Sequence, residues 1–320
     1  MRRYVIGRVA QAVGVLWAAF TLSFVVLYLL PADPVEIAAG DATTGTRVDA
    51  AAIAEMRARY GLDQPLVQQY WTALTHAVRG DLGHSIGTGQ SVTGALGDAL
   101  PTTLALASLA MLFALTGGTA LAVAAAYTER GWLRGLLTSL PPLGASAPTF
   151  WVGLLLLQVF SFRLRLVPAF GGSGFTATLL PAVTLAIPVG AVIAQVLYSS
   201  LITTWRQPFV EVAFAKGASR WWVQLRHVLR PASGAALTVS GLWVGTVLAG
   251  SVVVETVFSR NGIGRLTQEA VLHQDIPIVQ GVVTFAALAF VTVTLFVDLV
   301  LPLLDPRVAH SVSTKERAHA

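Results

Sequence analysis

The polar stretch EVAFAKGASRWWVQLRHVLRP, residues 211–231, is the feature around which this chain is organised. It separates two long apolar runs and carries four basic residues against one acid: Lys216, Arg220, Arg226 and Arg230 against Glu211. In membrane proteins, an excess of Lys and Arg marks the loops that face the cytoplasm. The stretch therefore predicts a cytoplasmic loop between membrane spans.

The local sequence of this loop predicts two short helices. Pro208 suits the first turn of a helix, residues 209–216 contain no breaker, and Gly217 is suited to end the helix. Residues 219–229 can form a second helix. We expect two short helices, bent at Gly217 and lying outside the bilayer.

Composition also indicates a membrane protein. Of the 320 residues, 55% are hydrophobic and 12% are charged, whereas a soluble domain has about 45–50% apolar and 25% charged residues. The net charge of +5 follows the expected topology and forms no single patch, which argues against nucleic-acid binding. The chain has no cysteine, so disulfides, thiolate catalysis and cysteine metal sites are excluded.

Six apolar runs are long enough for a spanning helix, which needs about 20 residues. They lie at about 9–30, 102–127, 136–160, 179–200, 234–258 and 279–303. A signal peptide is the alternative for the first run, but its apolar core would be only about 7–15 residues long, so we favour an uncleaved span. The predicted fold is an all-α polytopic membrane protein with six transmembrane helices.

These runs divide the chain into four parts. They are a tail with the first span (1–30), an external helical segment (31–101), a transmembrane core (102–303) that contains a cytoplasmic loop (206–231), and a cytoplasmic tail (304–320). In the external segment we expect a cap of two helices, from Asp49 to about Tyr60 and from Pro65 to about Val78. With six spans and both termini inside, Lys and Arg concentrate on the cytoplasmic side, as the positive-inside rule requires.

The central stretch also resembles a known motif. Glu211, Ala213, Gly217, His227 and Leu229 fall at the spacing of the EAA loop of the membrane subunits of ATP-binding-cassette (ABC) importers, although Val212 and Arg230 depart from its usual alanine and proline. The chain is similar to the dipeptide, oligopeptide and nickel permease branch. Further matching segments are LPADPVE (30–36), GDLGHS (80–85), SAPTFWVGLLL (146–156), VETVFSRNGIGRL (254–266), DIPIVQG (275–281) and VDLVLPLLDPR (297–307).

The resemblance implies a permease subunit of a bacterial inner-membrane importer of di- or oligopeptides. Its implied partners are a homologous second permease in a heterodimer, two ABC ATPase subunits and an external solute-binding protein. It also implies that the EAA loop is a coupling helix that docks on the ATPase through Glu211, Ala213, Phe214, Lys216, Gly217, Ala218, His227 and Leu229. From composition alone, an amphipathic loop lying on lipid headgroups and anchored by Trp221 and Trp222 fits equally well.

The chain itself lacks the parts of an ATPase. A P-loop needs a lysine followed by Ser or Thr, but the residues that follow Lys216 and Lys315 are Gly217 and Glu316. We expect no catalytic residue and no cofactor here, with ATP and Mg²⁺ bound by partner ATPase subunits. The six histidines show no i, i+4 pair, so no metal site is expected: His76, His84, His227, His273, His310 and His319.

Within the apolar runs, only a few small residues and one acid are candidates for a function. Gly241, Gly245 and Ala249 repeat at four-residue spacing, which allows close helix packing; by the resemblance, Gly241 and Gly245 are also candidates for lining the pathway. Asp298 is an acid inside the last run, and we favour a structural or interface role over proton coupling.

The external loops are expected to contact the binding protein. Gly171, Gly172 and residues 260–265 are the candidates, while a solvated turn containing Arg260, Arg265, Glu269 and Asp275 is the alternative. The same architecture importing nickel or another small solute remains open. So does an ion-driven secondary transporter, which would need internal repeats and buried ion ligands. A membrane protease lacks its nucleophile and base.

Overall fold

The computed structural model describes residues 2–28, 50–169 and 174–304. Within these ranges every regular element is a helix, which confirms the all-α prediction. The chain divides into two compact units: Met1–Thr102 together with Asn261–Ala320, and Thr103–Arg260.

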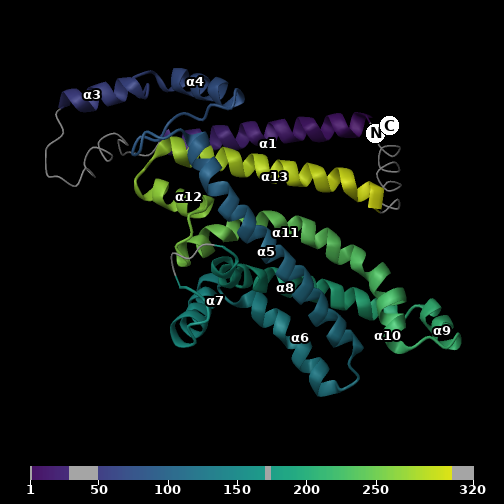
Figure 1. Ribbon diagram of the computed structural model, residues 1–320. Coiled ribbons are helices and arrows are strands. Elements are labelled where there is room, and N and C mark those ends of the chain that lie inside the picture. The colour runs from purple at the N-terminus through teal and green to yellow at the C-terminus, as the bar shows by residue number, and fades with distance from the viewer. Residues whose placement is uncertain (1, 29–49, 170–173, 305–320) are drawn as a thin grey trace. The chain divides into compact units, whose positions relative to one another are not determined.

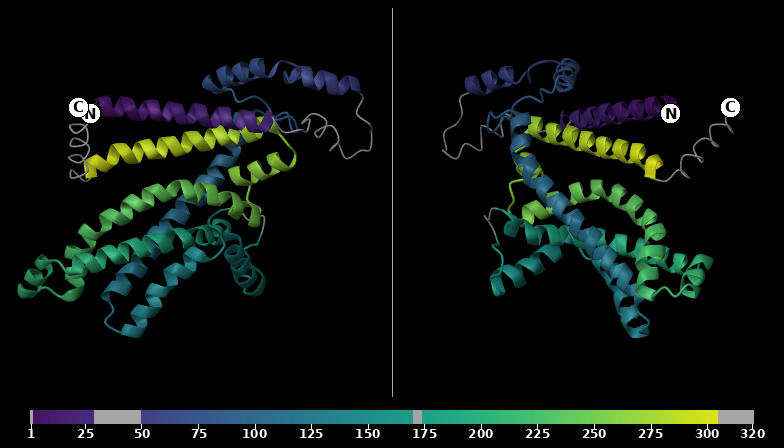
Figure 2. Two further views of the ribbon diagram at one scale, coloured as in Figure 1. Left: turned by 180° about the vertical axis from the view of Figure 1, so that it is seen from behind. Right: turned by 45° about the vertical axis from the view of Figure 1, so that its right-hand side comes forward.

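In the first unit, α1 (Arg2–Tyr28) and α13 (Ile276–Leu304) lie side by side (Figure 1 and Figure 2). The predicted helices of the external segment are α3 (Ala50–Arg59) and α4 (Leu66–Val78). Tyr70 of α4 packs edge-on against Phe24 of α1 at 5.3 Å between ring centroids, and its hydroxyl lies 2.8 Å from Thr21 Oγ1. These contacts hold α4 on one end of α1.

A small core completes this unit. It forms where the start of α5 (Val92–Tyr127) meets α12 (Ile263–Leu272) and α13, and its buried residues are Val92, Ala95, Leu96, Ala270, Ile278 and Val282. Most of α1 stays outside any core, because only 11% of its apolar part is buried. A helix that exposes this much apolar surface is suited to lipid rather than to water.

The second unit is built around α8 (Phe175–Trp205). This helix packs against α6 (Gly131–Ser146), α7 (Thr149–Leu156) and α11 (Leu229–Val257). In contrast to α1, 67% of its apolar part is buried. Its fully buried side chains include Ile193, Leu197 and Leu201, which lie in one core with Leu106 of α5 and Val247 of α11. The second unit therefore contains the main core of the described chain.

Among the described residues, four helices are long and apolar enough to cross a membrane: Ile6–Tyr28, Val92–Tyr127, Phe175–Trp205 and Arg220–Val257. The span predicted at 136–160 is not a single straight helix. Instead, α6 is followed by α7 and the π-helix η1 (Leu157–Arg163) after a bend of 107°, and the pair counts as a fifth span only if broken spans are included. At the bend, Ala147 adopts an extended conformation, with ψ 128°. The ring of Pro148 clashes with the helical conformation of the residue before it, which is Ala147.

Helices α5 and α13 also differ from the spans predicted for them. Helix α5 begins at Val92 and not at 102, and it continues through Pro101, which lacks the N–H that would bond the Gly97 carbonyl. In α13, the apolar part whose side chains are described, Ile276–Thr292, is shorter than a span. The count of six spans stays a prediction.

Close approach of α5 and α8 depends on two glycines, and this gives a first testable prediction. A Cβ at Gly118 would lie 2.6 Å from the backbone oxygen of Gly190, a contact that only separation of the helices relieves. Gly118→Ala is expected to cost about 1–3 kcal/mol, measured as a lower melting temperature of the purified chain in detergent.

The neighbouring glycine is the matched control. A Cβ at Gly117 meets nothing within 4 Å, so Gly117→Ala should leave the melting temperature unchanged or slightly raised, since alanine favours helix more than glycine does. Equal melting temperatures for both variants would contradict the close approach of α5 and α8.

Candidate functional site

The EAA loop, residues 206–231, begins with a short helix that ends at a glycine. Helix α9 (Pro208–Ala215) has proline in its first turn and Glu211 beside the positive end of its dipole. At its other end Gly217 has φ +81°, a left-handed conformation in which other residues are strained. The Gly217 N–H donates to the Phe214 carbonyl at 2.8 Å, and the Ala218 N–H to the Ala213 carbonyl at 3.2 Å. This is a Schellman turn, so the predicted bend at Gly217 is present.

The second part of the loop differs from the prediction. Ser219 caps a new helix, its Oγ accepting from the Trp222 N–H at 3.4 Å, but this helix does not end near residue 229. It runs through α10 (Arg220–Trp222) and the π-helix η2 (Val223–Val228) directly into α11, as one helical stretch of 38 residues, Arg220–Val257. The expectation of a short second helix was wrong. The second part of the loop and α11 therefore form one continuous helix.

A buried amide fixes this helix to its neighbours. Gln224 of η2 is 0% exposed. Its Oε1 accepts from the Trp205 indole Nε1–H, at the end of α8, at 3.0 Å, and its Nε2 donates to the Val123 carbonyl of α5 at 3.0 Å. Sequence reasoning missed Gln224. The signal was its helical register, which places it beside the buried Val223 and Val228.

Aromatic and charged side chains make further contacts at the start of this helix. The guanidinium of Arg220 lies 5.2 Å from the ring centre of Tyr127 and 5.8 Å from that of Trp205, and it pairs with Glu129. Cation–π contacts of this kind are worth about 0.5–1 kcal/mol at exposed sites. Trp221 packs edge-on against Tyr127 at 5.3 Å. The loop is thereby attached to the ends of α5 and α8.

The eight residues predicted to dock on a partner fall into two groups. Glu211, Phe214, Lys216 and Gly217 are exposed, next to the exposed apolar Phe209 and Val212. Ala213 is buried and Ala218, His227 and Leu229 are partly buried, so these four face the protein. The exposed group presents a mixed apolar and charged surface on α9. Trp221 and Trp222 are 50% and 54% exposed, as the headgroup interpretation also expects.

Comparison with known proteins assigns this architecture to a family. Residues 118–310 match the family described as "Binding-protein-dependent transport system inner membrane component", and residues 1–107 match the N-terminal region of the same kind of component. The chain belongs to this family. It is 35% identical over 310 residues to the glutathione transport system permease protein GsiC of Salmonella paratyphi A, covering 97% of this chain and 100% of the relative. GsiC of Escherichia coli (strain K12) is 34% identical over the same shares.

A solved structure shows the same fold. The methionine ABC transporter MetNI, in inward-facing conformations, is similar with a TM-score of 0.56 and 14% identity, over 66% of this chain and 96% of that chain. Together the matches confirm that the chain is a permease subunit of an ABC importer of the peptide and nickel branch. It is a multi-pass membrane transport component and not an enzyme.

At the other end of α11, the permease contains a second buried polar residue that the sequence interpretation missed. Glu255 is 0% exposed and accepts a hydrogen bond from Thr103 Oγ1 of α5 at 2.6 Å. Five residues later, Arg260 donates from Nη2 to Thr178 Oγ1 of α8 at 3.1 Å. Val247, Ser251 and Glu255 are all buried and lie four residues apart, which is the signal that could have found this acid. Arg260 thus connects α8 to the end of α11 as well as belonging to the predicted docking loop.

The alternative of a solvated external turn is wrong for Asp275. This residue is 7% exposed, and its carboxylate accepts from the Ser85 hydroxyl and from the Ile86 N–H, at 3.3 Å for the latter. Two segments recognised in the sequence, 80–85 and 275–281, therefore meet through one carboxylate. Arg265 and Glu269 form an exposed pair at 2.7 Å on α12, as a solvated surface would.

The remaining predicted positions are partly buried, exposed or outside the described residues. Gly241 and Gly245 are partly buried on α11 and Ala249 is exposed. Gly171, Gly172 and segment 30–36 lie outside the described residues, and so does the side chain of Asp298. Among the residues that are described, no group of three or more His, Asp or Glu side chains is placed to hold a metal ion.

Proposed function

We propose that this permease forms one half of the translocation pathway of an importer for short peptides. The observation that carries the proposal is the match to glutathione permeases along 97% of the chain and the whole length of the relatives. Glutathione is a tripeptide, so it lies within the di- and oligopeptide class that the sequence predicts. The second half of the pathway is a homologous permease, in an inner membrane with both termini of this chain in the cytoplasm.

The EAA loop is the proposed link to the ATPases. The exposed surface of α9 docks in a groove of a partner ATPase subunit, which binds ATP and Mg²⁺. Closure of the two ATPases moves α9, and the bonds of Gln224 carry this movement to α5 and α8, while the continuous helix Arg220–Val257 carries it to α11. An external solute-binding protein delivers the cargo at the opposite side. Gly241 and Gly245 of α11 are proposed to leave room for it in the pathway.

Purification and uptake together test this function. The chain is isolated from its native host in mild detergent, and its partners are identified by mass spectrometry. We expect two ABC ATPases, a second permease and a binding protein. The reconstituted assembly should then take up labelled glutathione or dialanine only with ATP.

Two outcomes contradict the proposal. ATP-dependent uptake of nickel with no uptake of peptide would replace the substrate class. Recovery of the chain alone, with uptake driven by an ion gradient, would instead favour a secondary transporter.

A further inference from the structure

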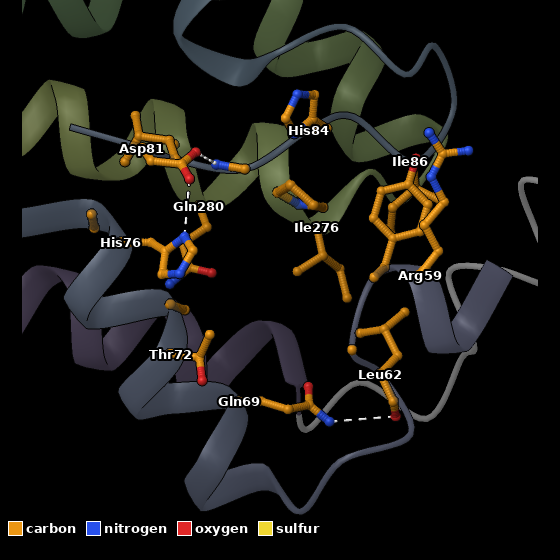
Figure 3. Close-up of a pocket in the computed structure, with 18 of the residues that line it drawn as sticks. Arg59, Leu62, Gln69, Thr72, His76, Asp81, His84, Ile86, Ile276 and Gln280 are labelled. Atoms are coloured by element: carbon orange, nitrogen blue, oxygen red, sulfur yellow. Dashed lines mark hydrogen bonds and ion pairs between the residues drawn. The ribbon is translucent and has the colours of Figure 1, made fainter. Parts of the chain in front are cut away.

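A pocket with a mixed polar and apolar lining lies in the first unit, between the helical cap and the ends of α1 and α13. Its volume is about 590 Å³, within the range of about 300–1,000 Å³ that small-molecule sites occupy. It is lined by α4, by the turn that precedes α4, by the loop 81–89 and by the first turns of α13. Figure 3 shows Arg59, Thr72, His76 and Gln280 around this common space, which we call the cap pocket.

One buried amide in the cap pocket has an unused donor. The side chain of Gln280 is on α13, the residue is only 8% exposed, and its Nε2 is buried with no hydrogen-bond partner among the described residues. A buried polar group left without a partner destabilises the folded protein. Gln280 also lines the cap pocket, so a rotation of its side chain brings this donor to an acceptor that a ligand supplies.

A second amide has an unused acceptor. Nε2 of Gln69 donates to the Gln64 carbonyl at 2.7 Å, which fixes the orientation of the amide, while its Oε1 is buried and has no partner within the described chain. The two amides that line the pocket thus carry one unused donor and one unused acceptor, both uncharged. A peptide group has the matching pair, because its carbonyl accepts and its N–H donates.

Charged groups in the lining point to the same ligand class. The Gly83 N–H and then His76 bond the carboxylate of Asp81 and lower its pKa, so it is ionised at neutral pH and suits an ammonium group. Arg59, in the same lining, suits a carboxylate. A phosphate headgroup fits less well, since it accepts hydrogen bonds only and would face the free Gln69 Oε1 and the Asp81 charge.

We propose that the cap pocket is a binding site for short zwitterionic peptides, held by Gln280 and Gln69 of the first unit. The ligand class follows from the chemistry of the pocket. Its position on the external side rests on the proposed function. In that topology, the site holds peptide next to the point where a binding protein releases it.

Direct binding of trialanine tests the proposal. The full chain is placed in lipid nanodiscs without partners, and trialanine is titrated by calorimetry, with its effect on the melting temperature as a second readout. We expect wild type to bind trialanine and to melt at a higher temperature with it. Gln280→Met should bind at least about tenfold more weakly, because it loses one hydrogen bond to the peptide. A tenfold change in affinity corresponds to about 1.4 kcal/mol. Because Gln280→Met removes an unpartnered donor, the unliganded variant should melt no lower than wild type.

The control is Gln11→Met, an exposed glutamine on α1 of the same unit, which should bind trialanine as wild type does. Equal affinities of wild type and Gln280→Met would place the binding elsewhere and overturn the site, as would no binding to wild type. Retention of a phospholipid by wild type but not by Gln280→Met, seen by native mass spectrometry, would overturn the peptide class. Failure of the proposed function is distinct, because it removes ATP-driven uptake by the assembly and leaves trialanine binding intact.

Discussion

Gly217→Val is expected to uncouple ATP hydrolysis from uptake in the reconstituted transporter. Gly217 has φ +81° and open space around its Cβ position, with nothing within 4 Å. The effect is therefore one of backbone conformation: a β-branched residue in the left-handed region costs at least about 1–2 kcal/mol. The Schellman turn opens and α9 loses its orientation. We expect uptake to fall about tenfold or more, with the chain still inserted in the membrane and ATP still hydrolysed.

Asparagine at the same position is the matched control. It tolerates the left-handed conformation far better than valine does, and Gly217→Asn should therefore retain most of the uptake. Both variants add a side chain to the same exposed surface, so equal loss in both would indicate a steric block of docking. Full uptake by Gly217→Val would show that the turn has no role in coupling.

Replacement of the buried amide Gln224 is expected to have the second large effect. Gln224→Met keeps the volume but removes both hydrogen bonds, leaving the indole N–H of Trp205 without its acceptor. An unpartnered buried donor costs about 1–3 kcal/mol, so the melting temperature should fall. Uptake should fall with it, because η2 is no longer tied to α5 and α8.

A double-mutant cycle separates this contact from general damage to the core. Trp205→Phe removes the donor of the same bond, so the double variant Trp205→Phe/Gln224→Met should lose less stability than the sum of the two single variants. Exposed Gln207 provides a further control in the same loop, and Gln207→Met should melt as wild type does. Additive losses would show that Trp205 and Gln224 act independently.

Local sequence signals were sufficient for most helices and for the glycine turn. Pro208 and Gly217 lie where the chain begins and ends α9, and the predicted helices of the external segment agree with α3 and α4 within a residue or two. These features depend on neighbours within one helical turn. Prediction was less accurate at the start of α5. The span was predicted to begin at about 102, just after Pro101, yet α5 begins at Val92 and runs through this proline.

By itself, the sequence determined the class of the protein: an all-helical membrane permease with a positively charged EAA loop, because hydropathy, charge and motif spacing are read along the chain. Only the tertiary structure showed that Gln224, Glu255 and Asp275 are buried. Their partners Val123, Thr103 and Ser85 lie 101, 152 and 190 residues away along the chain. Burial of a polar side chain is decided by which distant groups can satisfy it, and that information exists only once the helices are packed.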